Sequence, residues 1–226
     1  MTDLVDRLSG ESPLLAVNPG GVAAPVAEAL ARQGGAALFI DCERSAVGVA
    51  DAAGMARAAR AAGLPALLRT ESNAPSIVTR YLDCGIDGIV APNVESAAEC
   101  AALAETLARH AATAPRTALI VQVESVAGWQ RLDEIAAAEG VDAVLIGPND
   151  LAASMGLAGQ PRHPSVRAAV EEIAARLRAA GRPFGLPVTA ATARDWAERG
   201  ARLFYLGLAQ LLGAGLDQLR EPLRCP

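Results

Sequence analysis

Two acidic residues offer the most chemistry in this sequence, because each follows a short apolar run. Glu124 comes directly after the run 118–123, and Asp150 comes shortly after the run 143–146. If the two runs are adjacent parallel strands, their carboxyl ends place both carboxylates at one edge of the fold. Two carboxylates completed by water or substrate oxygens suit Mg²⁺ or Mn²⁺. The pair could equally be a general acid and base, or two solvated rim charges.

Composition narrows the available chemistry further. All 20 basic residues are arginine, and the chain contains no lysine. Schiff-base aldolases, pyridoxal phosphate enzymes and P-loops each need that amine, so these classes are excluded. His110 and His163 are the only histidines, which excludes a multi-histidine zinc site and most histidine-based triads. Acid, base and ligand candidates are therefore mostly carboxylates.

Charge and hydropathy indicate a cytoplasmic protein. A net charge of -5 gives no basic surface for nucleic acid or an anionic membrane. No apolar stretch approaches the ~18 residues that cross a bilayer, and the first twelve residues do not resemble a signal peptide. The cysteines are far apart and are expected to be reduced, buried thiols; they are Cys42, Cys84, Cys100 and Cys225.

Short branched-apolar runs alternate with alanine-rich helical segments along the whole chain, which is typical of a parallel sheet with crossover helices. The expected strands are Leu14–Val17, Ala37–Ile40, Ala66–Arg69, Gly88–Ala91, Ala118–Val123, Ala143–Ile146, Phe184–Pro187 and Leu203–Leu206. The expected helices are Ala24–Gln33, Ala52–Ala62, Ala74–Leu82, Ser96–Ala111, Trp129–Ala138, Ser165–Ala179, Ala191–Arg199 and Ala209–Leu219. Eight such units predict a single α/β domain, a (β/α)8 TIM barrel over residues 1–226.

The alternative fold is an open doubly wound sheet, which normally carries a glycine-rich phosphate loop after its first strand. Here that position reads Asn18-Pro19-Gly20-Gly21, which is only a turn signal. Polar residues instead follow several expected strands, as active-site residues of a barrel do. Asp87 and Asp142 precede strands and are expected at the opposite, amino end.

Longer motifs surround the two carboxylates. The segments Val121-Gln122-Val123-Glu124-Ser125 and Ile146-Gly147-Pro148-Asn149-Asp150-Leu151 closely resemble the metal-binding half of the HpcH/HpaI aldolase and citrate lyase family. Upstream, Asp41-Cys42-Glu43-Arg44, Leu68-Arg69 and Leu82-Asp83-Cys84-Gly85 resemble other signatures of that family, in the same order. The resemblance covers nearly the whole chain.

The resemblance implies a barrel of the phosphoenolpyruvate- and pyruvate-binding type that forms a homo-oligomer, either a hexamer or a trimer. It implies that Glu124 and Asp150 bind a divalent ion, Mg²⁺ or Mn²⁺, and that Arg69 stabilises an enolate oxygen. The substrate would be a small 2-oxo acid. The residues implied to bind it are Gln122, Gly147, Pro148 and Asn149.

The chain departs from the family pattern at the proton acceptor. Aldolases of the family have a histidine where this chain has Arg44, and that histidine pairs with the aspartate found here as Asp83. Arginine stays protonated, so Arg44 could pair with Asp83 or bind an anionic substrate, but it cannot act as a base. A metal-bound water, Glu43 or a group from another subunit would then have to accept the proton.

Two further departures are a missing loop between His110 and Thr117 and the absence of an aspartate after the last strand, which reads Leu206-Gly207-Leu208-Ala209.

The sequence supports three hypotheses of function. The first is a metal-dependent carbon–carbon lyase acting on a 2-oxo acid, with Arg69, Arg44 and Asp83 as catalytic residues. The second is a citrate synthase-like, citryl-lyase-like or oxaloacetate decarboxylase activity at the same site. The third is a degenerate, non-catalytic barrel.

Overall fold

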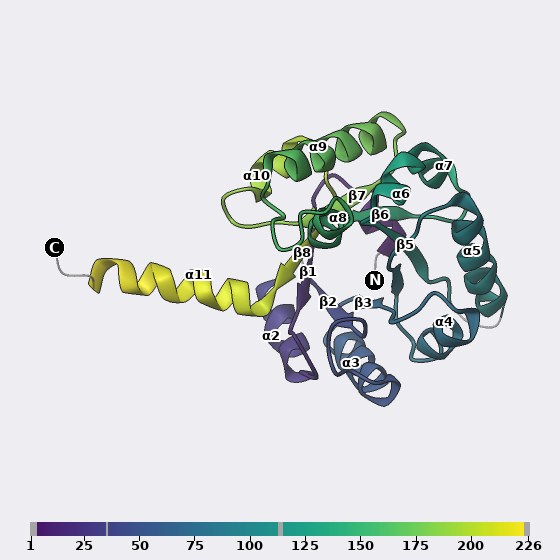
Figure 1. Cartoon of the computed structure of the whole chain (residues 1–226). Helices are drawn as coiled ribbons and strands as arrows, with labels where there is room; N and C mark the ends of the chain where they lie inside the picture. The colour runs from purple at the N-terminus through teal and green to yellow at the C-terminus, as the bar shows by residue number, and fades with distance from the viewer. Residues whose placement is uncertain (1–3, 35, 113–114, 224–226) are drawn as a thin grey trace.

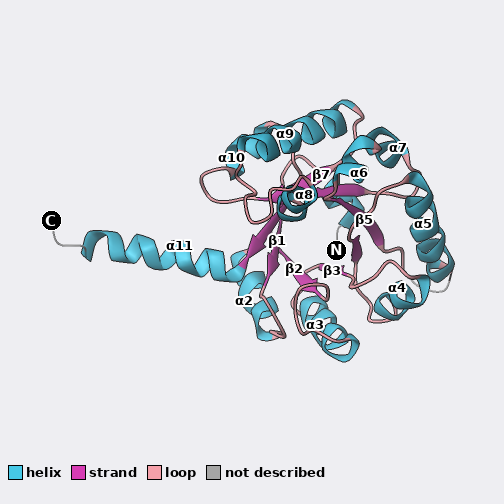
Figure 2. Cartoon of the chain, in the orientation of Figure 1, coloured by secondary structure: helices cyan, strands magenta, loops and turns pink. Residues whose placement is uncertain are grey.

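Eight parallel strands close into a barrel in the computed structural model, which describes residues 4–34, 36–112 and 115–223. Each strand pairs with the next in sequence, and β8 pairs with β1 to complete the ring (Figures 1 and 2). The strands are β1 (Leu14–Asn18), β2 (Ala36–Asp41), β3 (Ala66–Arg69), β4 (Gly88–Ala91), β5 (Ala118–Val123), β6 (Ala143–Ile146), β7 (Phe184–Pro187) and β8 (Leu203–Gly207). The predicted TIM barrel is confirmed.

The helices surround the ring of strands (Figure 2), except α1, whose Leu4 and Leu8 pack with the cluster of side chains inside the barrel. They are α1 (Leu4–Leu8), α2 (Pro25–Gln33), α3 (Val49–Ala61), α4 (Pro75–Leu82), α5 (Ala97–Ala111), α6 (Val126–Gln130), α7 (Leu132–Ala137), α8 (Pro148–Ser154), α9 (Pro164–Ala179), α10 (Ala193–Glu198) and α11 (Leu208–Arg220), followed by the 3₁₀ turn η1 (Glu221–Leu223). Among the described residues, no helix is long and apolar enough to cross a membrane.

Side chains alternate between the barrel interior and the helix layer, as the period of a strand requires. On β2, Ala37 and Phe39 belong to the interior cluster, whereas Leu38 and Ile40 pack with the surrounding helices. The ring of Phe39 meets Tyr205 of β8 edge-on, with 4.9 Å between ring centroids. Strands covered on both sides are mostly apolar, which explains why each predicted strand matches its observed bounds to within one residue at either end.

The amino end of the barrel is held by the two aspartates predicted to lie there. Asp87 Oδ2 accepts a hydrogen bond from the main-chain N–H of Ala66, and Asp142 Oδ2 accepts one from Leu119, both at 2.8 Å. Each carboxylate thus joins the start of one strand to its neighbour. Because the aspartates at the amino end have these structural roles, the candidate catalytic residues are those at the carboxyl ends of the strands.

The structure differs from the predicted helices at two places after β5. The expected helix Trp129–Ala138 is two short helices, α6 and α7, because the chain turns at Arg131. Helix α8 was not expected after β6, since it is short and begins at Pro148.

Three of the four cysteines lie in the described part of the chain as free thiols. Cys42 and Cys100 are buried and Cys84 is partly buried, while Cys225 lies outside the described residues.

The last helix does not complete the barrel as predicted. Figure 1 shows α11 extending away from the ring between α2 and α10. None of its described residues is buried, and Leu212 and Leu219 are 59% and 69% exposed. On β1, the outward-facing Leu15 is 38% exposed. The position over β8 and β1, which the eighth helix of such a barrel normally covers, is therefore left open by the chain's own α11.

Candidate functional site

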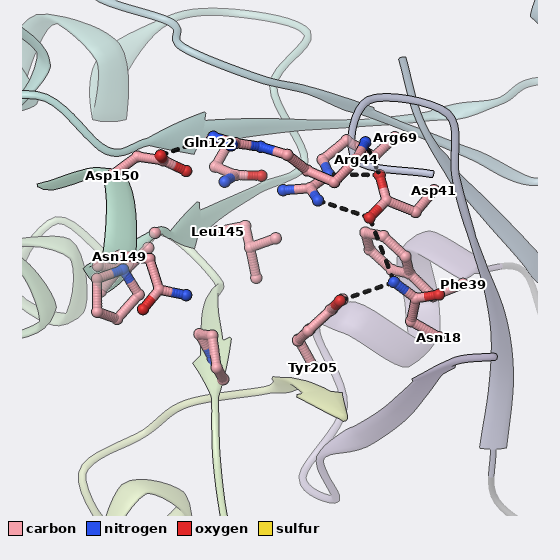
Figure 3. A pocket seen from close by; sticks show the side chains of 14 residues that line it. Asn18, Phe39, Asp41, Arg44, Arg69, Gln122, Leu145, Asn149, Asp150 and Tyr205 are labelled. Carbon is pink, nitrogen blue, oxygen red and sulfur yellow. Dashed lines mark hydrogen bonds and ion pairs between the residues drawn. The ribbon is translucent and has the colours of Figure 1, made fainter. Parts of the chain in front are cut away.

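A cavity of about 410 Å³ opens at the carboxyl ends of the strands (Figure 3). Its lining side chains come from most of the strands and from the segments that follow them. The residues are Asn18, Phe39, Asp41, Arg44, Arg69, Gln122, Leu145, Ile146, Gly147, Pro148, Asn149, Asp150, Pro187 and Tyr205. This is the barrel face at which polar residues were predicted to gather.

Arg69 is rigidly held at this mouth. Its Nε and Nη2 donate to the two oxygens of Asp41 at 3.0 and 2.7 Å, and its Nη1 lies 3.0 Å from Oε2 of Glu43. The side chain is only 11% exposed. Burial opposes its charge, but the hydrogen bonds and charge of Asp41 outweigh that effect and raise the pKa of Arg69. A fixed guanidinium therefore faces the cavity.

Asp41 is itself held by neighbouring strands. Asn18 Nδ2 donates to Asp41 Oδ2 at 3.3 Å and to the hydroxyl of Tyr205 at 2.7 Å. The resulting chain of polar contacts runs from β8 through β1 to Asp41 and Arg69 (Figure 3). Asn18 and Tyr205 were not predicted as site residues. Asn18 does form the predicted turn, accepting a hydrogen bond from Gly20, but its place at a strand end was the signal for a site role.

Glu124 lies next to the cavity wall and is 1% exposed. Its Oε1 accepts a hydrogen bond from the main-chain N–H of Asn93 at 2.9 Å, and its Oε2 accepts one from Gln122 Nε2. Burial raises the pKa of Glu124 to about 7, the Asn93 hydrogen bond opposes this shift, and the charge of Asp150 adds to it. Among the described residues, no arginine forms an ion pair with Glu124 that would offset the effect of burial.

Two backbone features make room for Glu124. Asn93 has φ +50°, a left-handed conformation that turns its N–H to the carboxylate. A Cβ on Gly147 would lie 2.6 Å from Glu124 Oε2 and 2.9 Å from Gln122 Nε2, so the close approach of β6 requires glycine.

Asp150 is the third residue of α8, and its Oδ1 lies 2.7 Å from Nη2 of Arg44. Figure 3 shows the Arg44 side chain reaching across the pocket mouth from the Asp41 side to Asp150. Pro148 and Asn149, beside Asp150, also line the cavity. Because proline has no main-chain N–H, the first residue of this short helix offers no donor to the cavity.

Comparison with known proteins identifies the family of the chain. The family model for HpcH/HpaI aldolase/citrate lyase matches residues 20–209. The chain belongs to this family. A 5-keto-4-deoxy-D-glucarate aldolase of Salmonella arizonae is 37% identical over 166 residues, covering 62% of this chain and 64% of the relative. The chain thus spans less than two thirds of the length of that relative.

Solved structures agree on the fold of this HpcH/HpaI family member. A family protein from Burkholderia cenocepacia superposes with a TM-score of 0.87 at 32% identity, covering 98% of this chain and 99% of the other. A structure named citrate synthase SbnG has a TM-score of 0.84 at 24% identity, with 98% and 99% coverage. At that identity, the second likeness supports the barrel alone.

Most residues that the family resemblance implied come together at the mouth. Arg69, Arg44, Gln122, Gly147, Pro148, Asn149 and Asp150 line one cavity, with Glu124 against its wall. Asp83 does not join them. It follows the last turn of α4, is 68% exposed, and lies 3.3 Å from Nε2 of His110 on α5.

Pairing with Asp83, one of the two roles considered for Arg44, therefore does not occur within one chain. A crossover helix of a parallel barrel returns from the carboxyl end of the ring to the amino end, so the residue that ends α4 is carried away from the mouth. Arg44 instead pairs with Asp150.

HpcH/HpaI family members are in general dependent on a divalent metal. The oxygen-rich wall fits a hard cation, because Gln122 Oε1 is buried without a hydrogen-bond partner among the described residues. Two arginines face four carboxyl groups here, those of Asp41, Glu43, Glu124 and Asp150, so acidic groups outnumber cationic side chains at the site. The described residues contain no cluster of three or more carboxylate, histidine or cysteine ligands. Amide, water or substrate oxygens would have to complete the shell.

Proposed function

We propose that this chain is a divalent-metal-dependent carbon–carbon lyase acting on a 2-oxo acid. The observation that carries the proposal is Arg69, fixed by Asp41 and directed into a cavity whose wall holds Glu124 and Asp150. Breaking the bond beta to a ketone leaves its electron pair on an enolate. Placing positive groups where that charge develops lowers the barrier.

The residues divide this work. Glu124 and Asp150 would hold Mg²⁺ or Mn²⁺, with Gln122 contributing its unpartnered Oε1. The bound ion would supply Lewis-acid stabilisation of the developing charge. Arg69 would donate to the enolate oxygen without having to reorganise, because Asp41 already fixes its plane. Asn149 and the main chain at Gly147 would contact the carboxylate end of the substrate.

An aldol cleavage also needs a base for the distal hydroxyl of the substrate. Neither histidine lines the cavity: His110 ends α5, and His163 caps the start of α9. The 5-keto-4-deoxy-D-glucarate aldolase relatives nevertheless support a pyruvate-releasing aldolase as the first candidate. A group from another subunit, a water or Glu43 would then accept the proton.

The missing imidazole favours a second candidate, oxaloacetate decarboxylation, over reactions that begin by removing a proton. Loss of CO₂ from oxaloacetate leaves the same enolate and requires no hydroxyl deprotonation. The ordered contacts around Arg69 argue against the third reading, a barrel without turnover, because a site released from function has no need to keep a buried arginine between two carboxylates.

One assay set separates these readings. Purified protein would be supplied with 4-hydroxy-2-oxo acids, with oxaloacetate, and with oxaloacetate plus acetyl-CoA, each with and without Mn²⁺. We expect Mn²⁺-dependent turnover of at least one of them, measured as pyruvate release or as citrate formation with release of CoA, and we expect it to be lost in Glu124→Gln and Asp150→Asn. Calorimetry on the same variants should show loss of Mn²⁺ binding. Protein that binds Mn²⁺ yet turns over none of these substrates would support the non-catalytic reading.

We also propose a homo-oligomer in which two copies exchange α11. Leu208, Leu212, Leu216 and Leu219 recur at helical spacing and form one apolar face. A lone helix with these leucines in water, and with Gly213 and Gly215 each costing about 1 kcal/mol relative to alanine, needs a partner surface.

The open position over β8 and β1 is the complementary surface, because each copy lacks there the helix that the other presents. Reciprocal exchange creates a twofold pair, which a hexamer contains and a trimer does not. Light scattering should therefore give a hexamer that Leu212→Arg dissociates. Ala214→Arg, on the opposite face of α11, is the matched control. A monomeric parent protein would contradict the proposal.

A further inference from the structure

Arg44 and Arg69 are the two cations that line the cavity, and they are held in different ways. Arg69 is nearly buried and clamped by two oxygens of Asp41. Arg44 is 56% exposed and makes one hydrogen bond to Asp150 at 2.7 Å, with Glu43 farther away at 3.9 Å. Arg69 is thus part of the cavity wall. The Arg44 side chain instead extends across the opening, and its hydrogen bond to Asp150 is the contact that keeps it there.

The hydrogen bond between Arg44 and Asp150 can be replaced by another interaction of Asp150 at little cost in stability. Asp150 is 34% exposed, and ion pairs this accessible add little net stability because water solvates both partners well. Asp150 is also a residue that the proposed metal site requires. A divalent ion offers the carboxylate twice the charge at shorter range than a guanidinium does. The ion and Arg44 therefore compete for the same carboxylate.

Displacement would leave the Arg44 guanidinium free at the cavity mouth. Arg69 cannot take the same role, because Asp41 and Glu43 already enclose it. A planar guanidinium with free N–H groups matches a carboxylate in a bidentate manner. The substrate atoms nearest the opening are those farthest from the 2-oxo acid end, so a second carboxylate at that distal end would meet Arg44.

We propose that Arg44 is a cation-released specificity residue. It holds Asp150 while no divalent ion is bound, and the ion frees it to bind the distal carboxylate of a dicarboxylic 2-oxo acid. This inference rests on the proposed function, because it uses the same metal site. It gives the arginine at the histidine position a role that does not involve proton transfer.

The first test follows release of Arg44 directly. Phenylglyoxal, which modifies accessible arginines, would be applied without Mn²⁺, with saturating Mn²⁺, and with Mn²⁺ plus 2-oxoglutarate, and adducts would be mapped by peptide mass spectrometry. Adduct formation at Arg44 should rise at least ~3-fold with Mn²⁺ and fall again with 2-oxoglutarate. Arg109 is the internal control, since its pair with Glu105 is similarly short, at 2.8 Å, and its side chain is similarly exposed, at 61%, but it lies on α5.

The second test measures selectivity by calorimetry on Mn²⁺-loaded protein. 2-Oxoglutarate and 2-oxopentanoate have the same carbon chain and differ in whether a carboxylate or a methyl group ends it. The parent protein should bind the dicarboxylate at least ~10-fold more tightly. Arg44→Met should abolish that preference, Arg44→Lys should retain part of it, and Arg109→Met should leave it unchanged.

The outcomes separate this inference from the proposed function. If calorimetry shows Mn²⁺ bound but the Arg44 adduct does not change, Arg44 does not compete for Asp150 and the inference is wrong while the metal site stands. An equal preference in the parent and in Arg44→Met overturns it in the same way. If the parent binds no Mn²⁺ at all, the metal site is wrong and this inference falls with it.

Discussion

Replacing Gly147 by alanine tests whether the close packing of β6 against Glu124 is what shapes the site. Gly147 has φ −103°, which any residue adopts, so the change strains no backbone angle. The added Cβ would, however, lie 2.6 Å from Glu124 Oε2 and 2.7 Å from Glu124 Cβ. The carboxylate must therefore move.

The size of that movement follows from the contact. Ordinary contact begins near 3.4 Å, so Glu124 Oε2 must retreat by about 0.8 Å. Its hydrogen bond from Asn93, now 2.9 Å long, would be strained or lost. Metal ligands are held to within about 0.2 Å, and losing a supporting contact typically costs about 10- to 100-fold in metal affinity. We expect a loss of this size, with about 1–3 kcal/mol of stability from overpacking.

Calorimetry of Mn²⁺ binding, together with thermal melting, checks this prediction. Gly21→Ala is the control, because a Cβ there meets no atom within 4 Å. A Gly147→Ala protein that stays folded and binds Mn²⁺ within about 2-fold of the parent would refute the reasoning. Either Glu124 would not be a ligand, or its position would not depend on Gly147.

Three other substitutions probe the contacts around the cavity. Arg69→Ala should lower kcat by at least ~100-fold, because the lost donor acts mainly on developing charge; an effect confined to KM would make Arg69 a binding residue. Asn93→Ala should weaken Mn²⁺ binding measured by calorimetry more than Asn93→Gly, since only glycine adopts φ +50° without strain. Tyr205→Phe should reduce the unfolding free energy measured with urea by about 0.5–1.5 kcal/mol, because Asn18 loses its 2.7 Å acceptor; an unchanged value would mean that this contact contributes nothing.

The strands could be predicted because most of them are buried on both faces and therefore appear as apolar runs. Once the strands were assigned, the polar residues at their carboxyl ends could be predicted as site residues, and most of them line the cavity. Tyr205 was missed because it lies within an apolar run, and only the register with β1 brings its hydroxyl to Asn18.

The placement of α11 could not be predicted from its sequence. The same leucine spacing buries a helix against its own barrel or against a second copy, so amphipathicity fixes which face is apolar and not what covers it. The ion-pair partner of Arg44 could not be predicted for a related reason. Its partner depends on the reach of a long side chain across the mouth, and the family pattern indicated Asp83, which α4 carries to the other end.

The two arginines show how the number of carboxylates around a side chain determines what it can do. Arg69 meets two carboxylates and is fixed, which suits a group that must stabilise charge without moving. Arg44 meets one close carboxylate, and metal binding requires that same carboxylate. Because a guanidinium stays protonated, the exchange of histidine for Arg44 removes a proton acceptor and adds a permanent charge at the cavity mouth. Such a change disfavours chemistry that begins by deprotonating a hydroxyl there, and it favours substrates whose distal end is itself negatively charged.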